Sequence, residues 1–386
     1  MSAWVKQIAS QVKKHGEEKA SWYCFWTEPD GTRRKKSCGA GAKGQRLADR
    51  MAEKRKAELL LGSYKREERK TWKDFRVEYE RRVLPEMKPN SAAQIRYTLD
   101  RFEELAKPKR IGDVNKRTVD TFIEKRREQR GRKPNSKVTP STVNRDLTNI
   151  RAALNVAAEW GYIAAVPKIR LLKVPQRLPN FVTPEHFADI FNNCDAATAP
   201  KELPFPQANW WRALLTMAQM TGWRIGELLS LKWTDVDLEA GTAVTRYADN
   251  KGGRSERIAL HPVVVDQLRG IRSFDDRVFP WDKDRRSLYN EFARIQDAAG
   301  IKIPCPDAGN PNHGECTDAC NRYGFHDERR AFATLNAEHM TREALQALMR
   351  HMDSATTDRY INYARQVNPA VANLHVPDVL KASGTA

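Results

Sequence analysis

The sequence predicts a multidomain, mainly α-helical protein with small β-sheets (α+β). Three observations favour this fold class. A chain of 386 residues is too long for one ordinary hydrophobic core and fits two or three domains. Apolar residues recur at helical spacing through 71–163. Short apolar segments next to turn residues, near the amino terminus and again at 241–260, are typical of the strands of small sheets.

The charge of the chain indicates what it binds. Lys and Arg outnumber Asp and Glu by 67 to 49, which gives a formal net charge of +18. Such a field attracts a polyanion, which leaves nucleic acid or an anionic membrane as partners. The chain has no run of about 18 apolar residues to span a bilayer, and its first residues contain no apolar signal segment. We therefore expect a cytoplasmic protein that binds nucleic acid and no membrane.

Residues 1–65 are expected to form a small sheet-plus-helix module. The aromatic segment 21–27 predicts a strand, and the Asp-Gly pair that follows it predicts a hairpin turn. The next strand carries four consecutive basic residues, beginning at Arg33. A stretch rich in Ala, Leu, Lys and Glu at 43–61 predicts a helix. The basic strand is either a DNA contact or a solvated edge whose charges prevent aggregation.

Residues 70–165 are expected to form a separate domain of four or five helices. Ser91 and Ser141 are the predicted N-caps of two of them. Basic residues crowd 125–133, where they face either solvent or a phosphate backbone. The residues that recur at helical spacing include Ile95, Leu99, Phe102, Val143, Leu147, Ile150 and Leu154.

A third domain follows a linker. Residues 166–180 contain three prolines and no apolar period, which predicts an extended linker. Thr183 and Pro184 then open a helix as N-cap and first-turn residue. The third domain is expected to cover 181–376, and 377–386 form a tail.

Four segments of the third domain carry residues suited to chemistry on a phosphate. The first, 221–231, reads Thr-Gly-Trp-Arg-Ile-Gly-Glu-Leu-Leu-Ser-Leu. Its first glycine breaks the preceding helix and the apolar residues bury the next one. Arg224 is therefore expected near a helix N-terminus, where backbone N–H groups also favour an anion. The second segment, 241–260, predicts two short strands around a glycine-rich turn that carries Lys251.

The third and fourth segments add imidazoles and a phenol. The third, 324–334, reads Gly-Phe-His-Asp-Glu-Arg-Arg-Ala-Phe-Ala-Thr. On a helix, His326 and Arg329 share one face because they lie three residues apart. In the fourth segment His351 precedes Tyr360 by nine residues, with turn residues and a helix start between them. Each of these residues alone is more typical of a surface ion pair or of packing than of a site.

The order and spelling of the four segments resemble the catalytic domain of the tyrosine recombinase, or phage integrase, family. The pattern of that family is a Thr-Gly-x-Arg-x-x-Glu-Leu box, a hairpin Lys, a His-x-x-Arg box and a Gly-His box. A Tyr follows nine residues after the last His. Carried over motif by motif, the resemblance implies six active-site residues: Arg224, Lys251, His326, Arg329, His351 and Tyr360.

The resemblance also implies an architecture and a function. Residues 181–376 would be a mixed α/β tyrosine-recombinase catalytic domain, 70–165 a core-binding domain and, by a looser match, 1–65 an arm-type DNA-binding module. The enzyme would cleave and rejoin double-stranded DNA through a 3'-phosphotyrosine on Tyr360, as a homo-tetramer on paired sites. It would integrate or excise a mobile element and use no cofactor in catalysis. A type IB topoisomerase-like enzyme and a DNA-binding regulator without chemistry remain alternatives.

In this mechanism fixed guanidinium groups meet the extra negative charge of a pentavalent phosphorane. His326 is the implied base and Lys251 the implied acid for the leaving 5' oxygen, while His351 binds the phosphate. Tyr363 shares a helical face with Tyr360 and is a rival nucleophile, but its distance from the histidine departs from the family spacing.

Two residues depart from the family pattern. Arg350 stands where the family has Gly, and Glu328 stands where it has an apolar residue. Neither occupies one of the six implied positions, although Arg350 is expected to alter how His351 is presented. In this family the segment after the tyrosine packs on a neighbouring subunit, so 367–376 is expected to couple subunits.

A loop between the second and third segments has the composition of a metal site. Three Cys and one His lie within sixteen residues rich in Gly, Pro and Asn: Cys305, His313, Cys316 and Cys320. This set suits a structural, tetrahedral Zn²⁺ that would order a loop with few apolar residues. The alternative is an exposed loop with reduced thiols.

Overall fold

The computed structural model describes residues 2–62, 64, 70–174, 180–246, 255–305, 307–310 and 312–366, with side chains as far as residue 362. Helices dominate this part of the chain, and two antiparallel sheets of three strands each accompany them. Contacts divide the chain into two compact units, residues 1–131 with 137–174 and residues 132–136 with 175–386. The predicted fold class, mainly α with small β-sheets, is confirmed.

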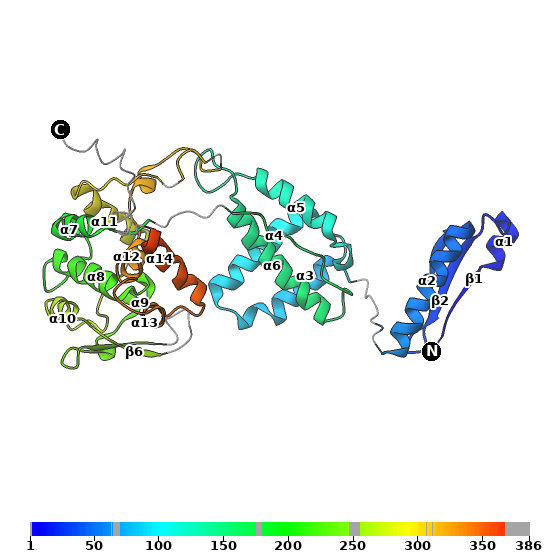
Figure 1. The fold of residues 1–386 in the computed structure, drawn as a ribbon, viewed down its shortest axis with the longest axis horizontal. Helices are drawn as coiled ribbons and strands as arrows, with labels where there is room; N and C mark the ends of the chain where they lie inside the picture. Colours follow the sequence, from blue (N-terminus) through cyan, green and yellow to red (C-terminus); the bar gives the residue numbers. More distant parts are fainter. Residues whose placement is uncertain are drawn as a thin grey trace, which may run out of the picture. The chain divides into compact units, whose positions relative to one another are not determined.

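The amino-terminal part is a three-stranded sheet with one long helix lying along it (Figure 1). Its elements are β1 (Ala3–Gln7), α1 (Ala9–His15), β2 (Ser21–Thr27), β3 (Arg33–Ala40) and α2 (Gly41–Leu60). β2 is the central strand and pairs antiparallel with both neighbours, and Cys24, Trp26 and Ala52 form the core beneath α2. The aromatic strand, the basic strand and the helix agree with the prediction. β1 and α1 have no counterpart in it because both are too short to establish a period.

The rest of the first unit is helical. Its elements are α3 (Trp72–Arg82), η1 (Leu84–Glu86), α4 (Pro89–Ala106), η2 (Ile111–Asp113), α5 (Lys116–Glu128) and α6 (Pro140–Glu159). The predicted apolar residues of α4 and α6, among them Leu99, Phe102, Leu147 and Leu154, lie in one buried core. Residues 166–174 have no regular structure, and Ile169 and Leu172 pack against this core.

The predicted N-caps Ser91 and Ser141 are wrong. α4 begins at Pro89 and α6 at Pro140, so each serine lies inside the first turn. Proline is favoured at the first helical position because its missing N–H would have no partner there. In α6 the residue before the proline, Thr139, accepts the capping hydrogen bond from a first-turn backbone N–H at 3.3 Å.

The second unit is built around a buried helix. Its helices and strands are α7 (Pro184–Asn192), η3 (Cys194–Ala196), α8 (Gln207–Thr221), α9 (Ile225–Ser230), η4 (Trp233–Asp235), β4 (Val236–Asp237), β5 (Thr242–Thr245), β6 (Glu256–Ala259), α10 (Pro262–Arg269), α11 (Arg285–Ala298), η5 (Asp318–Asn321), α12 (Phe325–Leu335), α13 (Arg342–Met349) and α14 (Ser354–Gln366). Trp210 and Trp211 of α8 are fully buried in the main core. As predicted, Thr183 caps α7, with Pro184 as its first residue.

A second, smaller core joins the last three helices to one another. Phe332 of α12, Leu345 and Met349 of α13, and Tyr360 and Ile361 of α14 form it. This core fixes α14, and therefore the phenol, relative to α12. Within the described ranges, no helix combines the length and the apolar composition of a membrane span.

Candidate active site

The first segment places Arg224 at the start of a short helix. α8 ends at Gly222, whose φ of +62° is a left-handed conformation that glycine adopts without strain. A Cβ atom here would lie 2.6 Å from Cδ1 of Phe332, so a larger residue would displace that ring. The chain then passes Trp223 and enters α9 with Arg224 as the N-cap residue.

Glu227 holds Arg224 in place. Its Oε2 atom accepts from the Arg224 backbone N–H at 3.0 Å, and its Oε1 atom accepts from Nη1 of the Arg224 guanidinium at 3.1 Å. The side chain of Glu227 is 4% exposed and that of Arg224 is 34% exposed. Arg224 therefore presents a partly exposed guanidinium above a buried carboxylate.

The third segment forms the first turns of α12. Arg329 is buried, and its guanidinium donates to the backbone oxygens of Gly222 and Met349. These two bonds tie α12 to the ends of α8 and α13. Among the described residues, no carboxylate forms an ion pair with Arg329. His326 lies one turn earlier and makes no hydrogen bond within the same set of residues.

The fourth segment brings an imidazole against the phenol. Nδ1 of His351 lies 3.0 Å from the hydroxyl oxygen of Thr357 in α14. The imidazole stacks on the ring of Tyr360, with ring centroids 6.0 Å apart and planes inclined by 15°. Tyr360 is 8% exposed. The spacing of nine residues thus places the two rings face to face.

Both imidazoles are neutral at pH 7. Desolvation by the surrounding protein, followed by the positive charges of neighbouring arginines, lowers the pKa of His326 to about 4, although the residue is exposed at the surface. Burial and then the same kind of charge lower the pKa of His351 to about 4. Arg224 and Arg329 act on both rings. Either imidazole can therefore accept a proton.

The groups that shift the pKa of Arg329 come from several of the four segments. Burial lowers the pKa of Arg329 to about 10, and the positive charges of Arg224 and Arg350 act in the same direction. Glu227 and Tyr360 oppose this shift. One guanidinium is therefore within electrostatic reach of residues from α9, from the end of α13 and from α14. Among the predicted residues, Arg224, His326, Arg329, His351 and Tyr360 come together.

Lys251 and the side chain of Tyr363 lie outside the described residues, as does the predicted subunit-coupling segment 367–376. β5 and β6, which flank Lys251 in the sequence, pair antiparallel as far as Thr245 opposite Glu256. The two strands predicted around the glycine-rich turn are thus confirmed.

Both departures from the family pattern have side chains with little exposed surface. Glu328 has no exposed surface, and within the described structure neither of its carboxylate oxygens has a hydrogen-bond partner. Burial, helped by the charge of Asp327, raises the pKa of Glu328 to about 8, so this carboxyl is neutral at pH 7. Arg350 reaches Glu227 and forms an ion pair with it. The family pattern contains no such contact, and its sequence signal is the long side chain of Arg350 at a position where the family has Gly.

The four predicted metal ligands form one cluster. Their ligand atoms lie within 4.8 Å of one another. Nε2 of His313 lies 3.2 Å from Sγ of Cys305, 3.4 Å from that of Cys316 and 3.7 Å from that of Cys320. Ligand atoms around a tetrahedral Zn²⁺ are separated by about 3.5 Å, given the usual Zn–N and Zn–S distances. Nζ of Lys133, which belongs to the same compact unit, lies 3.1 Å from Sγ of Cys320.

Known proteins resemble this chain over the same segments. The phage integrase family matches residues 180–366. Tyrosine recombinase XerA of Thermococcus onnurineus (strain NA1) is 25% identical over 288 residues, which cover 70% of this chain and 84% of XerA. The defective protein IntQ of Escherichia coli (strain K12) is 32% identical over 139 residues, which cover 33% of this chain and 32% of IntQ. The chain thus spans about a third of the length of that relative.

Solved structures share the fold. A lambda integrase dimer bound to a COC' core site superposes with a TM-score of 0.56 at 16% identity, covering 94% of this chain and 95% of that one. XerH bound to palindromic difH substrate in a post-cleavage complex superposes with a TM-score of 0.55 at 17% identity, covering 74% and 79%. Because the family match spans the convergent arginines, histidines and tyrosine, residues 180–366 of this chain form a domain of the phage integrase family, the tyrosine site-specific recombinases.

Proposed function

We propose that this protein cleaves and rejoins double-stranded DNA at specific sites through a 3'-phosphotyrosine bond on Tyr360. The observation that carries the proposal is the buried guanidinium of Arg329. It lies within electrostatic reach of Arg224 and Tyr360 and, within the described ranges, has no carboxylate bound to it. Preorganised cations of this kind stabilise the charge that develops on a phosphorane. A regulator that only binds DNA has no need of such a charge beside a phenol.

The cleavage step exchanges one P–O bond for another. The phenolic oxygen of Tyr360 forms a bond to phosphorus and loses its proton, while the bond to the 5' oxygen breaks and that oxygen takes up a proton. We assign Arg224 and Arg329 to the non-bridging oxygens, which planar guanidinium groups can bind with two hydrogen bonds. The bond energy stays in the phosphotyrosine, so rejoining is the reverse reaction and requires neither ATP nor a catalytic metal.

Three residues handle the protons and the phosphate. His326, neutral at pH 7, is assigned as the base that takes the phenolic proton. Lys251 is assigned as the acid for the 5' oxygen. We assign the Thr357 hydroxyl as the donor to Nδ1 of His351, an assignment that places the ring proton on Nε2, from which it can bind the phosphate.

A suicide DNA substrate tests the proposal. Its nick lets the cleaved 5' end diffuse away, so the covalent protein–DNA species accumulates and is seen on a denaturing gel. We expect the species for the unaltered protein and for Tyr363→Phe, and none for Tyr360→Phe. A covalent species in Tyr360→Phe would refute the assignment. Intact DNA binding without any covalent species in the unaltered protein would favour the regulator.

A second assay separates recombination from topoisomerase activity. A recombinase needs two sites and a tetramer, whereas a type IB topoisomerase relaxes supercoiled DNA alone. We expect light scattering to detect tetramers on DNA that carries paired sites. In cells, we expect the protein to integrate or excise a mobile element in the cytoplasm. If the monomer relaxed supercoiled plasmids that lack the recombination site, the recombinase assignment would be refuted.

We also propose roles for the other parts of the chain. Residues 70–165 are assigned as the core-binding domain, 1–65 as an arm-type module and 181–376 as the catalytic domain. Separate buried cores around Leu99, Trp26 and Trp211 support this division. Removal of 1–65 is expected to leave cleavage of a short core-site substrate intact and to weaken binding to longer DNA. Equal binding of both DNAs by the truncated and full-length proteins would contradict the arm-type role.

The cysteine cluster is proposed to hold one structural Zn²⁺ through Cys305, His313, Cys316 and Cys320. The distances between their ligand atoms and the burial of His313 and Cys320 support this proposal. A positive group, Lys133, next to the thiolates would offset the excess negative charge of a three-thiolate zinc site.

Elemental analysis of protein purified without chelator tests the zinc proposal. We expect about one zinc per chain, most of it lost in Cys320→Ser. Cys38→Ser, outside the cluster, is the matched control and should retain the metal. Protein that contains no zinc and takes none up on titration would refute the proposal.

A further inference from the structure

Arg350 has a backbone conformation that glycine would adopt without strain. It follows α13 with φ of +53° and ψ of +45°, in the left-handed region. This region is unfavourable for a residue with a Cβ atom. The chain thus carries backbone strain to place a side chain here. That side chain is 7% exposed, and its guanidinium lies 4.9 Å from the ring centroid of Trp223.

The guanidinium of Arg350 shares one carboxylate with Arg224. Nη2 of Arg350 donates to Oε2 of Glu227, while Nη1 of Arg224 donates to Oε1 of the same group. Two cations therefore lie on one buried anion. Arg224 is the more exposed of the two, at 34%, and so is the one that an incoming phosphate can reach.

Arg350 also has unused donors. Its Nε and Nη1 atoms are buried and lack a hydrogen-bond partner among the described residues. The ion pair with Glu227 thus uses only the Nη2 atom of a guanidinium that can form two parallel hydrogen bonds to a carboxylate. Both spare donors belong to the same guanidinium as Nη2, so Arg350 has the donors for a second hydrogen bond to Glu227.

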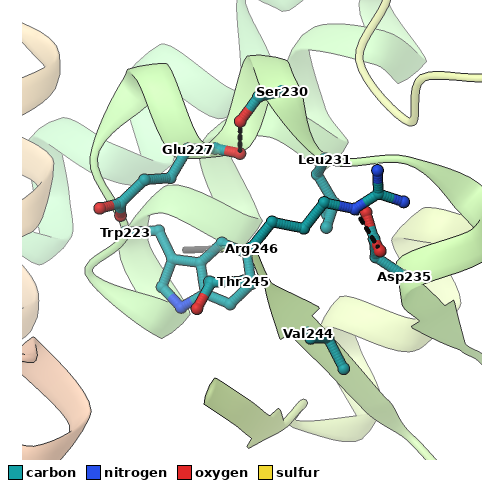
Figure 2. Close-up of a pocket in the computed structure, with 8 residues that line it drawn as sticks. All are labelled: Trp223, Glu227, Ser230, Leu231, Asp235, Val244, Thr245 and Arg246. Carbon is teal, nitrogen blue, oxygen red and sulfur yellow. Dashed lines mark hydrogen bonds and ion pairs between the residues drawn. The ribbon is translucent and has the colours of Figure 1, made fainter. Parts of the chain in front are cut away.

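Arg246, a nearby cation, is engaged elsewhere. A small pocket beside β5 is lined by Trp223 and Glu227, and Figure 2 shows the Arg246 guanidinium pointing away from Glu227, toward Asp235. The distance from Nε of Arg246 to Oδ1 of Asp235 is 2.8 Å. Within the described part of the chain, Glu227 therefore relies on Arg224 and Arg350 for charge compensation.

We propose that Arg350 is a positioning residue: it keeps Glu227 compensated when Arg224 moves from Oε1 of Glu227 to the scissile phosphate. A carboxylate left buried without a cation is strongly unfavourable, so without Arg350 the carboxylate would hold Arg224 back. The inference rests on the proposed function and adds a third arginine to its site. Arg350 acts through Glu227 and Arg224, and not on the phosphate itself.

A double-mutant cycle tests this role. The rate of covalent complex formation is measured in single turnovers at saturating suicide DNA for the unaltered protein, Arg350→Gly, Glu227→Gln and the double variant. Arg350→Gly is expected to slow cleavage by about tenfold or more when Glu227 is present. In the Glu227→Gln background the same change should have little effect, because no carboxylate remains to retain Arg224.

Lys107→Gly is the matched control for the backbone. Lys107 is an exposed residue that ends α4 in the same left-handed conformation, with φ of +50°. This substitution should leave the cleavage rate unchanged. Melting temperatures of all variants show whether each one is folded at the assay temperature.

The outcomes separate this inference from the proposed function. If the unaltered protein forms no Tyr360-dependent covalent complex, the proposed function fails. If that complex forms and Arg350→Gly does not slow it, the inference alone fails. An equal slowing by Arg350→Gly in both backgrounds would also overturn it, because Arg350 would then act independently of Glu227.

Discussion

Arg126 in the first unit and Arg329 in the second are both buried arginines, but their surroundings differ. Nε of Arg126 donates to Asp146 at 2.9 Å, and its Nη1 donates to Gln129 at 2.7 Å. Asp146, itself fully buried, also accepts from the Thr98 hydroxyl at 3.2 Å. Within the described residues, the hydrogen bonds of Arg329 go to two backbone oxygens.

The difference separates an architectural charge, that of Arg126, from the charge that we propose to be functional, that of Arg329. Arg126 is balanced by its own carboxylate, so its pair joins α5 to α6 and leaves no field for a ligand. The single carboxylate of Glu227 acts on three guanidinium groups, those of Arg329, Arg224 and Arg350, so the site keeps an excess of positive charge. A phosphate would complete the set, because buried charges are stable only when paired.

Arg329→Lys is expected to have the largest effect on cleavage. An ammonium group keeps the charge but cannot bond two backbone oxygens and a phosphate in one plane. We expect the single-turnover cleavage rate to fall by about a hundredfold or more, as for loss of one preorganised donor. The protein should remain folded in a thermal melt. A fall smaller than tenfold would show that Arg329 is as structural as Arg126.

Arg126→Met should produce the opposite result. It leaves Asp146 buried without a cation, so the free energy of unfolding should fall by about 3–5 kcal/mol. The cleavage rate per folded molecule should not change. Denaturant unfolding measures the first effect and single-turnover kinetics the second. The control Arg126→Met/Asp146→Leu should recover much of the stability. A variant that is slow in cleavage yet fully stable would contradict the architectural role of Arg126.

The same contrast separates what sequence reasoning predicts from what it misses. The aromatic strand and the periodic helices depend on local patterns, and they appear where those patterns predict them. The N-caps at Ser91 and Ser141 fail because the prolines two residues and one residue earlier are themselves good helix starts. The contact between Arg350 and Glu227 joins residues 123 positions apart, and no local pattern encodes such a pair.

Glu328 is a buried carboxyl that differs from both arginines because it is neutral at pH 7, and this difference can be measured as a pH dependence of stability. Its folded-state pKa of about 8 lies above the ordinary value of 4.5. Between these values the unfolded chain releases a proton that the folded state retains, so stability should fall as pH rises from 4.5 to 8. The slope for one group is about 1.4 kcal/mol per pH unit. Unfolding of the unaltered protein and of Glu328→Gln across this range measures it. Identical slopes for the two proteins would rule out a neutral Glu328.

Each of the two imidazoles has a smaller pKa shift than Glu328, and the sign of its effect on stability is reversed. His326 and His351 have folded-state pKa values of about 4, below the ordinary 6.5. Between pH 4 and 6.5 the unfolded chain binds protons that the folded state does not, so stability should rise with pH over this range. NMR titration, with His326→Gln and His351→Gln for assignment, measures both values. A bound phosphodiester should raise both pKa values, because it offsets the charges of Arg224 and Arg329 that add to the effect of burial. Values near 6.5 in the free protein would mean that neither burial nor the arginine charges lower the pKa of these imidazoles.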